Sequence, residues 1–154
     1  LDAVKNKGLK VTAPNKGDSF EIGKAKCEVM TDSILNKDNL NLSSIVIRLE
    51  FENNSFLFMG DAETANEKTR TWMKTDVLKV GHHGSNTSSS EDFLKQINPT
   101  YAVIMAGKNN SYGLPKQKIL DRLAKIGAKV YRTDEEGTIM MISNGNNIEV
   151  KENT

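Results

Sequence analysis

The sequence lacks several features that define common kinds of protein. It has one cysteine, Cys27, in 154 residues, which excludes an intrachain disulfide. No apolar run approaches the roughly 20 residues that cross a bilayer, and there is no signal-peptide pattern, so we expect no membrane segment in this chain. Because Cys27 lies in an alternating segment, we predict that it is a small core residue and not a nucleophile.

Charge of one sign is also missing. The chain has 21 basic and 20 acidic residues, giving a net charge of +1. They are interspersed, without a basic run or an arginine stripe, so charge alone does not indicate nucleic-acid binding. A glycine-rich phosphate loop and the nucleophile elbow of serine hydrolases are absent too. The 37% hydrophobic and 27% charged content is that of a globular domain.

Hydrophobic periodicity predicts a β-meander, then alternating strands and helices, then a terminal hairpin. The predicted strands are residues 9–12, 20–22, 25–30, 45–51, 56–59, 77–80, 101–106, 130–132, 138–143 and 147–150. The predicted helices are residues 62–73, 91–97 and 115–126, and residues 31–44 are a predicted loop. Ser88 and Glu91 have the spacing of a capping box. This order indicates the α/β class, with no internal domain boundary.

The only two histidines, His82 and His83, are adjacent, flanked by Gly81 and Gly84, and directly follow a predicted strand. Neutral imidazole is the commonest ligand for zinc-like ions, and strand ends hold ligands rigidly. The alternative is a loop in which both imidazoles bond backbone groups. The pattern therefore predicts a metal site, without deciding which ring is the ligand.

A carboxylate follows the preceding predicted strand, in Met59-Gly60-Asp61. Asp61 is either a helix N-cap or a ligand that converges with the histidines on one cation. Gly60 and Gly81 allow close packing or unusual dihedrals at these strand ends. A third strand exit, residues 107–113, has the composition of an ordinary polar loop.

Five segments occur together in a characteristic order. They are Met-Gly-Asp-Ala-Glu at 59–63, Asp-Val-Leu-Lys-Val-Gly-His-His-Gly-Ser at 76–85, Tyr-Ala-Val-Ile at 101–104, Lys-Asn-Asn-Ser-Tyr-Gly-Leu-Pro at 108–115 and Val-Tyr-Arg-Thr-Asp at 130–134. The set resembles the carboxy-terminal part of a metallo-β-lactamase-fold hydrolase of the ComEC-like subgroup, which includes the soluble domain of competence DNA-uptake channel proteins. The resemblance covers nearly the whole chain and implies an α/β (α+β) fold, an αββα sandwich with its metal site at one edge.

The resemblance also implies that part of the fold is missing. The family's first metal motif, His-x-(His or Asp)-x-Asp-His, lies amino-terminal to anything in this sequence. We therefore expect residues 1–154 to be the carboxy-terminal portion of a single metallo-β-lactamase-like domain. The family's metal-bridging aspartate falls on Asp61, and its later histidine falls on the His82 and His83 pair.

Two positions depart from the family pattern. Where many members have a histidine, this chain offers only Asn41, Ser43 and Ser44, which argues against a full two-zinc site. Leu114 stands where subgroup members often have the histidine of a Tyr-Gly-His-Pro motif. A leucine neither ligates a metal nor relays a proton, so a contact expected there is in question.

By resemblance, the complete protein is a metal-dependent hydrolase of a phosphodiester or other ester, acting through metal-activated water. The candidate metal ligands are Asp61, His82 and His83, and the candidate catalytic residues are Asp61 and His83. The implied cofactor is a divalent ion, zinc or alternatively manganese, bound weakly or not at all by these residues alone. The implied partners are DNA or another phosphodiester and the upstream part of the same domain, in an extracytoplasmic location.

Two other readings of the sequence compete with the hydrolase. One is a non-catalytic binding or scaffold domain derived from this fold, for which Leu114 is the sign. The other is a small doubly wound domain that binds a phosphorylated ligand, which fits the β-α order but lacks the phosphate loop.

Overall fold

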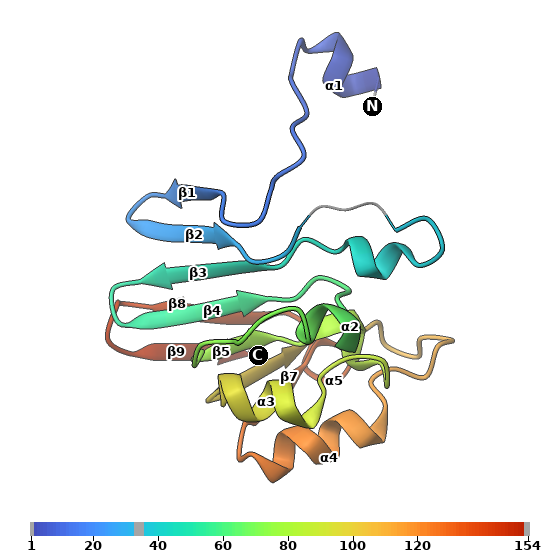
Figure 1. Ribbon diagram of the computed structural model, residues 1–154. Coiled ribbons are helices and arrows are strands. Elements are labelled where there is room, and N and C mark those ends of the chain that lie inside the picture. Colours follow the sequence, from blue (N-terminus) through green and yellow to red (C-terminus); the bar gives the residue numbers. More distant parts are fainter. Residues whose placement is uncertain (1, 33–35, 153–154) are drawn as a thin grey trace.

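The computed structural model describes residues 2–32 and 36–152. Its centre is a mixed sheet in which seven strands lie side by side in chain order (Figure 1). The strands are β1 (Ser19–Ile22), β2 (Ala25–Val29), β3 (Ile47–Phe51), β4 (Asn54–Phe58), β5 (Val77–Lys79), β6 (Tyr101–Ile104) and β7 (Lys129–Arg132).

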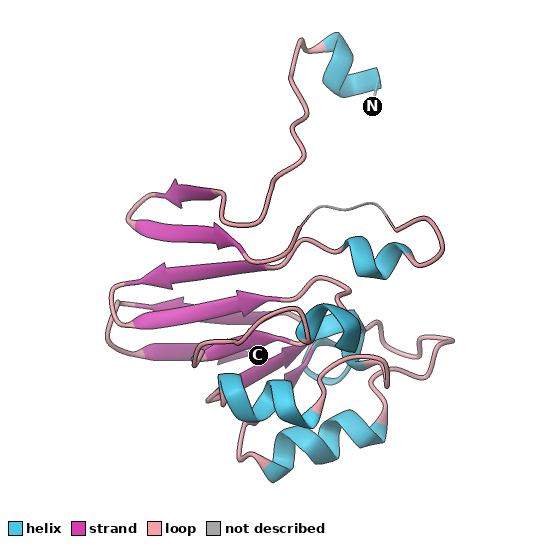
Figure 2. Ribbon diagram, viewed as in Figure 1, coloured by secondary structure: helices cyan, strands magenta, loops and turns pink. Residues whose placement is uncertain are grey.

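The sheet changes direction at β4. Strands β1 to β4 pair antiparallel, whereas β4 to β7 pair parallel. Short turns join β1 to β2 and β3 to β4, and the longer segment 30–46 joins β2 to β3. Parallel neighbours require crossover connections, and here these carry helices. The crossover helices are α2 (Thr64–Glu67), α3 (Glu91–Ile97) and α4 (Gln117–Lys125). They lie on one face of the sheet (Figure 2).

The main core lies between these helices and the sheet. Leu57, Leu78 and Ile104 are almost fully buried on the helix-facing side. Phe93 of α3 meets the ring of Trp72 edge-on, with 5.2 Å between centroids. Because β4 to β6 carry apolar residues on both faces, they read as continuous apolar runs, as expected for central strands.

A second, two-stranded sheet lies behind the first in Figure 1. It is the hairpin of β8 (Ile139–Ser143) and β9 (Ile148–Glu152), paired antiparallel as the Asn-Gly turn predicts. The remaining elements are α1 (Asp2–Asn6), α5 (Thr133–Glu136), η1 (Leu40–Ser43) and η2 (Gly81–Gly84). Helices, mixed sheet and hairpin confirm the α/β class and agree with part of an αββα sandwich.

Three local predictions were wrong. Residues 9–12 are not a strand. The helix predicted at 62–73 has only the four residues of α2. The N-cap of α3 is Ser90, not Ser88, which is buried. Of the predicted loop 31–44, residues 33–35 lie outside the described residues.

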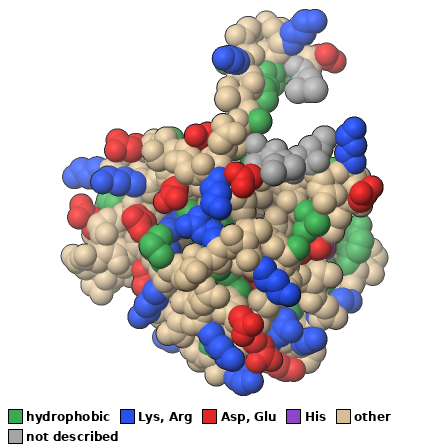
Figure 3. All heavy atoms as spheres, viewed as in Figure 1, with side chains coloured by type: hydrophobic (Ala, Val, Ile, Leu, Met, Phe, Trp, Pro, Cys, Tyr) green, Lys and Arg blue, Asp and Glu red, His purple; other side chains and the backbone are tan. Residues whose placement is uncertain are grey.

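On the face in Figure 3, lysines and arginines alternate with acidic residues. The chain therefore presents no broad patch of one charge on that face, in agreement with the sequence. Within residues 2–32 and 36–152, every helix is too short or too polar to cross a bilayer.

Candidate metal and active site

The parallel pairing of β4 and β5 brings two predicted ligands together. Asp61 lies three residues beyond the end of β4, and His83 lies four residues beyond the end of β5. Because parallel strands end at the same edge of a sheet, these two loops meet there. The amide of His82 donates to the carbonyl of Gly60 at 3.1 Å, which joins the loops directly.

His83 and Asp61 form the centre of the site. His83 Nε2 lies 3.3 Å from Asp61 Oδ1, and both side chains are 44% exposed. His83 Nδ1 lies 2.6 Å from the carbonyl oxygen of Met105, which only accepts, so Nδ1 carries a proton and donates it. In the neutral ring, Nε2 then presents a lone pair towards a carboxylate. A proton or a cation shared by His83 Nε2 and Asp61 Oδ1 would satisfy the lone pairs of both atoms.

His82 is held differently. Its Nδ1 lies 3.2 Å from Glu63 Oε1 and 3.1 Å from Thr87 Oγ1, and its Nε2 lies 3.4 Å from Asn41 Nδ2. Both ring nitrogens thus face side chains of the protein. The structure places His82 beside Glu63 and His83 beside Asp61, so the adjacent histidines occupy distinct environments.

Glu63 organises the surroundings of His82. It accepts hydrogen bonds from Asn39 at 3.0 Å, Asn41 at 3.2 Å and Thr87 at 3.0 Å. Burial opposes ionisation of this carboxyl, but those three hydrogen bonds and nearby His82 outweigh it and lower the pKa of Glu63. Glu63 is therefore a charged anchor for one imidazole.

The histidine turn has a strained backbone. His82 and His83 both adopt left-handed conformations, with φ of 45° and 52°. Each such non-glycine residue costs on the order of 1–3 kcal/mol, and such strain gathers at functional sites. Gly81 has no room for a side chain, since a Cβ there would lie 2.7 Å from the carbonyl oxygen of Ala62. The close packing predicted at Gly81 is thus observed.

Lys79 connects the two ligand-bearing strand ends. Its Nζ donates to the carbonyl of Gly60 at 2.9 Å and to that of Val80 at 3.4 Å. Burial lowers the pKa of Lys79, while the charge of Asp61 opposes that shift. An ammonium group therefore lies close to the candidate metal ligands.

The two positions that depart from the family pattern are both at the site. Asn41 reaches His82 and Glu63, and Ser44 Oγ accepts the amide of Asp61 at 3.2 Å. Ser43 instead accepts the amide of Asn36 at 2.7 Å. Leu114 lines a cavity of about 240 Å³ together with His83.

The side chains fit a divalent cation in kind but fall short in number. An imidazole whose other nitrogen donates to a backbone carbonyl, beside a carboxylate oxygen, is an arrangement typical of metal ligands. Zinc takes three or four protein ligands. Among the residues that the structure describes, no group of three or more His, Cys, Asp or Glu side chains is placed to hold a metal. Asp61 and His83 would be two ligands of an incomplete set.

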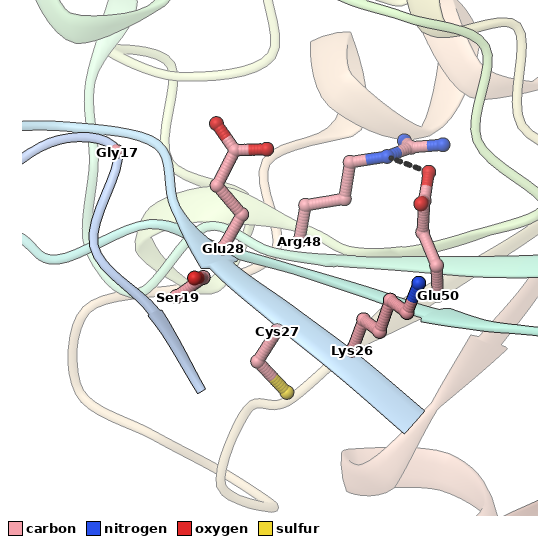
Figure 4. A pocket seen from close by; sticks show the side chains of 7 residues that line it. All are labelled: Gly17, Ser19, Lys26, Cys27, Glu28, Arg48 and Glu50. Carbon is pink, nitrogen blue, oxygen red and sulfur yellow. Dashed lines mark hydrogen bonds and ion pairs between the residues drawn. The ribbon is translucent and has the colours of Figure 1, made fainter. Parts of the chain in front are cut away.

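A separate cavity of about 330 Å³ lies on the outer strands β1 to β3 (Figure 4). Lys26, Glu28, Arg48 and Glu50 line it, and Arg48 Nε donates to Glu50 Oε1 at 2.9 Å. Cys27 also borders it but is only 2% exposed, and burial raises the pKa of its thiol. The prediction that Cys27 is a core residue is confirmed.

Sequence reasoning missed Glu63, Thr87 and Lys79. The spacing Asp61-x-Glu63 was visible, as was a lysine between apolar residues in the strand of residues 77–80. Neither signal reveals the partner, because Glu63 and His82 are 19 positions apart in loops without periodicity. The metal-binding role of Asp61, His82 and His83 stays a prediction.

Comparison with known proteins identifies relatives of this chain. The profile described as "Metallo-beta-lactamase superfamily" matches residues 11–108. The chain is 37% identical over 143 residues to ComE operon protein 3 of Bacillus subtilis (strain 168), covering 90% of this chain and 18% of that protein. It is 42% identical over 101 residues to Recombination protein 2 of Haemophilus influenzae, covering 64% and 13%.

A third relative is matched over a similar share of the chain. Over 104 residues the chain is 36% identical to Competence protein ComA of Neisseria gonorrhoeae, covering 64% of this chain and 15% of that protein. The chain thus spans less than a fifth of the length of each of these three relatives. The resemblance read from the sequence is confirmed.

Proposed function

Because this chain belongs to the metallo-beta-lactamase superfamily, we propose that it forms part of a metal-dependent hydrolase acting on a phosphodiester or another ester. The observation that carries the proposal is the pair His83 Nε2 and Asp61 Oδ1, 3.3 Å apart, with the other nitrogen of His83 tied to Met105. Asp61 and His83 would hold a divalent ion, zinc or manganese, which would lower the pKa of bound water towards about 7 and polarise a phosphoryl oxygen.

The residues of this chain have distinct proposed roles. Asp61 holds the cation and orients the attacking water, and His83 is the imidazole ligand. His82, engaged by Glu63 and Asn41, positions the turn. Lys79 holds the two strand ends together through the carbonyls of Gly60 and Val80.

The partners are part of the same proposal. The remaining ligands come from an amino-terminal part of the domain, so the 154 residues alone bind metal weakly and turn over poorly. DNA or another phosphodiester is the substrate, and the location is extracytoplasmic. The names of two relatives, Recombination protein 2 and Competence protein ComA, support DNA as the substrate.

Variants of Asp61 and of the two histidines test the proposal. In the natural protein that contains these residues, Asp61→Asn and His83→Gln should abolish metal-dependent hydrolysis of an oligonucleotide. His82→Gln, the matched control, should reduce metal affinity only about 10-fold, since it removes a neighbour and not a ligand. Hydrolysis and zinc affinity by calorimetry are the measurements. Full activity of Asp61→Asn would contradict the proposed hydrolase site. Tight zinc binding with turnover in the 154 residues alone would contradict only the proposal that the remaining ligands come from elsewhere in the domain.

A second candidate function has one observation in its favour. Leu114 replaces a polar residue expected beside His83, and it lines the same cavity. This favours a non-catalytic binding or scaffold domain derived from the fold. Absence of hydrolysis by the natural protein with zinc or manganese, together with retained ligand binding, would establish that alternative.

A further inference from the structure

Tyr112 is an exposed aromatic side chain next to the candidate active site. Tyr112 is 78% exposed, so packing within its own domain does not account for its position. It lines the cavity of about 240 Å³ that His83 and Leu114 also line. The metal proposal gives Tyr112 no role, so its position requires a separate explanation.

The loop that carries Tyr112 has a defined shape. Asn110 Nδ2 donates to the carbonyls of Gly107 at 2.9 Å and Leu114 at 2.7 Å, and its Oδ1 accepts the amide of Leu114 at 3.0 Å. Lys116 Nζ donates to the carbonyl of Tyr112 at 2.8 Å. The side chain of Asn110 is thus occupied in closing the loop, and the ring of Tyr112 is the group left to meet a ligand.

The cavity is small and its wall is mostly apolar. Besides His83 and Tyr112, its lining includes the apolar residues Met105, Ala106 and Leu114, together with Gly107 and Asn110. Its volume is below the roughly 300–1,000 Å³ typical of sites for whole drug-sized ligands. Leucine at position 114 makes this wall apolar where a histidine would have made it polar. An unstacked heteroaromatic ring fits these properties better than a phosphate does.

Two lysines flank Tyr112 along the chain. Lys108 precedes it in the same loop, and Lys116 Nζ donates to its carbonyl at 2.8 Å. The carboxylate beside the cavity is that of Asp61, which lies 3.3 Å from His83. Aromatic rings next to lysines are the combination that binds single-stranded nucleic acid, since the rings stack on bases and the cations meet the backbone.

We propose that Tyr112 is a stacking platform for one base of a single-stranded nucleic acid, seated in the cavity beside His83. The inference rests on the proposed function, because it takes the phosphodiester substrate to be a polynucleotide. The adjoining phosphodiester then extends from the cavity towards Asp61 and His83. A paired base in a duplex is already stacked on its neighbours, so the ligand is a single strand.

Binding experiments on the 154-residue chain test this without turnover. Fluorescence anisotropy, in the presence of a chelator, would compare a short labelled thymidine oligonucleotide with an abasic strand of equal length and charge. We expect the thymidine strand to bind about 10-fold more tightly than the abasic strand, and Tyr112→Ala to remove that difference. Tyr112→Phe, the matched control, keeps the ring and should retain the preference.

Each outcome decides the proposal. Equal affinity for the two strands, no binding of either, or an unchanged preference in Tyr112→Ala overturns it. Circular dichroism of Tyr112→Ala checks that the fold is intact. Lys108→Ala should lower the affinity for the thymidine strand and for the abasic strand by the same factor. The base preference without hydrolysis in the natural protein would refute the proposed hydrolase and leave the stacking site standing. Hydrolysis without the preference would do the reverse.

Discussion

Two neighbouring histidines with different partners are the main result at the scale of residues. The sequence presents His82 and His83 as equivalent, whereas the structure separates them. His83 donates to a backbone carbonyl and points its other nitrogen at Asp61. His82 lies against Glu63, whose carboxylate also receives three neutral donors. The ring centroids of the two residues lie 6.4 Å apart, with their planes at 64°.

The charge of Glu63 should appear in the pH dependence of stability. Its folded pKa is lowered, so its carboxylate stabilises the fold above the ordinary glutamate value of about 4.3, and this contribution is lost as the pH falls through the folded pKa. Glu63→Gln should cost about 1–2 kcal/mol of unfolding free energy at pH 7 and flatten the loss of stability below pH ~4.3. Urea unfolding in metal-free buffer across the acid range measures both.

Glu21→Gln is the matched control, because Glu21 is an exposed glutamate on β1. It should leave both the stability and its acid dependence as in the parent chain. If Glu63→Gln kept the parent's acid dependence, the anchoring role of this carboxylate would be wrong.

At the scale of elements, a buried carboxylate joins two helices. Glu67, the last residue of α2, is 3% exposed and accepts the amides of Ser89 at 2.5 Å and Ser90 at 2.9 Å, just before α3. Glu67→Gln places an amide N–H against one of these donors. We expect a loss of about 2–3 kcal/mol, seen as a lower urea midpoint at unchanged slope. Asp92→Asn, in the exposed first turn of α3, should cost under about 1 kcal/mol; equal effects would contradict the argument.

Elements with a local signal could be predicted from the sequence. The bounds of α3 follow from its cap residues and from Asn98-Pro99, and alternation places Ile47, Leu49 and Phe51 on one face of β3. The helix predicted at 62–73 failed because a tertiary contact overrode local propensity. After Glu67 the chain turns at residues 68–70 and leaves the helix. Trp72 then reaches Phe93 and donates its indole N–H to the carbonyl of Glu67 at 2.6 Å.

The candidate site was predictable only in part, for a related reason. Parallel strands end at one edge, so Asp61 and the histidines were expected to converge, and the structure brings Asp61 and His83 together. The distinction between His82 and His83 depends on Glu63, Asn41 and Met105, which come from three separate loops or strand ends. No sequence period links such positions, so these contacts emerge only from the folded arrangement.

At the scale of the whole molecule, the two ends of the described chain differ in how they are attached. Residues 2–13 are exposed except for partly buried Val4, and this segment extends away from the sheet in Figure 1. Its backbone bonds, such as Leu9 N to Val4 O at 3.0 Å, close within the segment. The carboxy-terminal hairpin instead packs on the sheet, where Ile139 and Met141 share a cavity wall with Phe56, Val77 and Val103.

Two truncations should therefore have opposite consequences for the free energy of unfolding. Removing residues 1–13 should change it by less than about 0.5 kcal/mol, since none of the described residues 2–13 is buried. Removing residues 138–154 exposes the apolar side chains beneath the hairpin to water and deletes the hydrogen bond from Ser143 to Asn54. This truncation should cost about 3 kcal/mol or more. Urea unfolding followed by the fluorescence of Trp72, which is 4% exposed, reports both changes. A large loss from the amino-terminal truncation, or a negligible one from the other, would show that this account of the attachment is wrong.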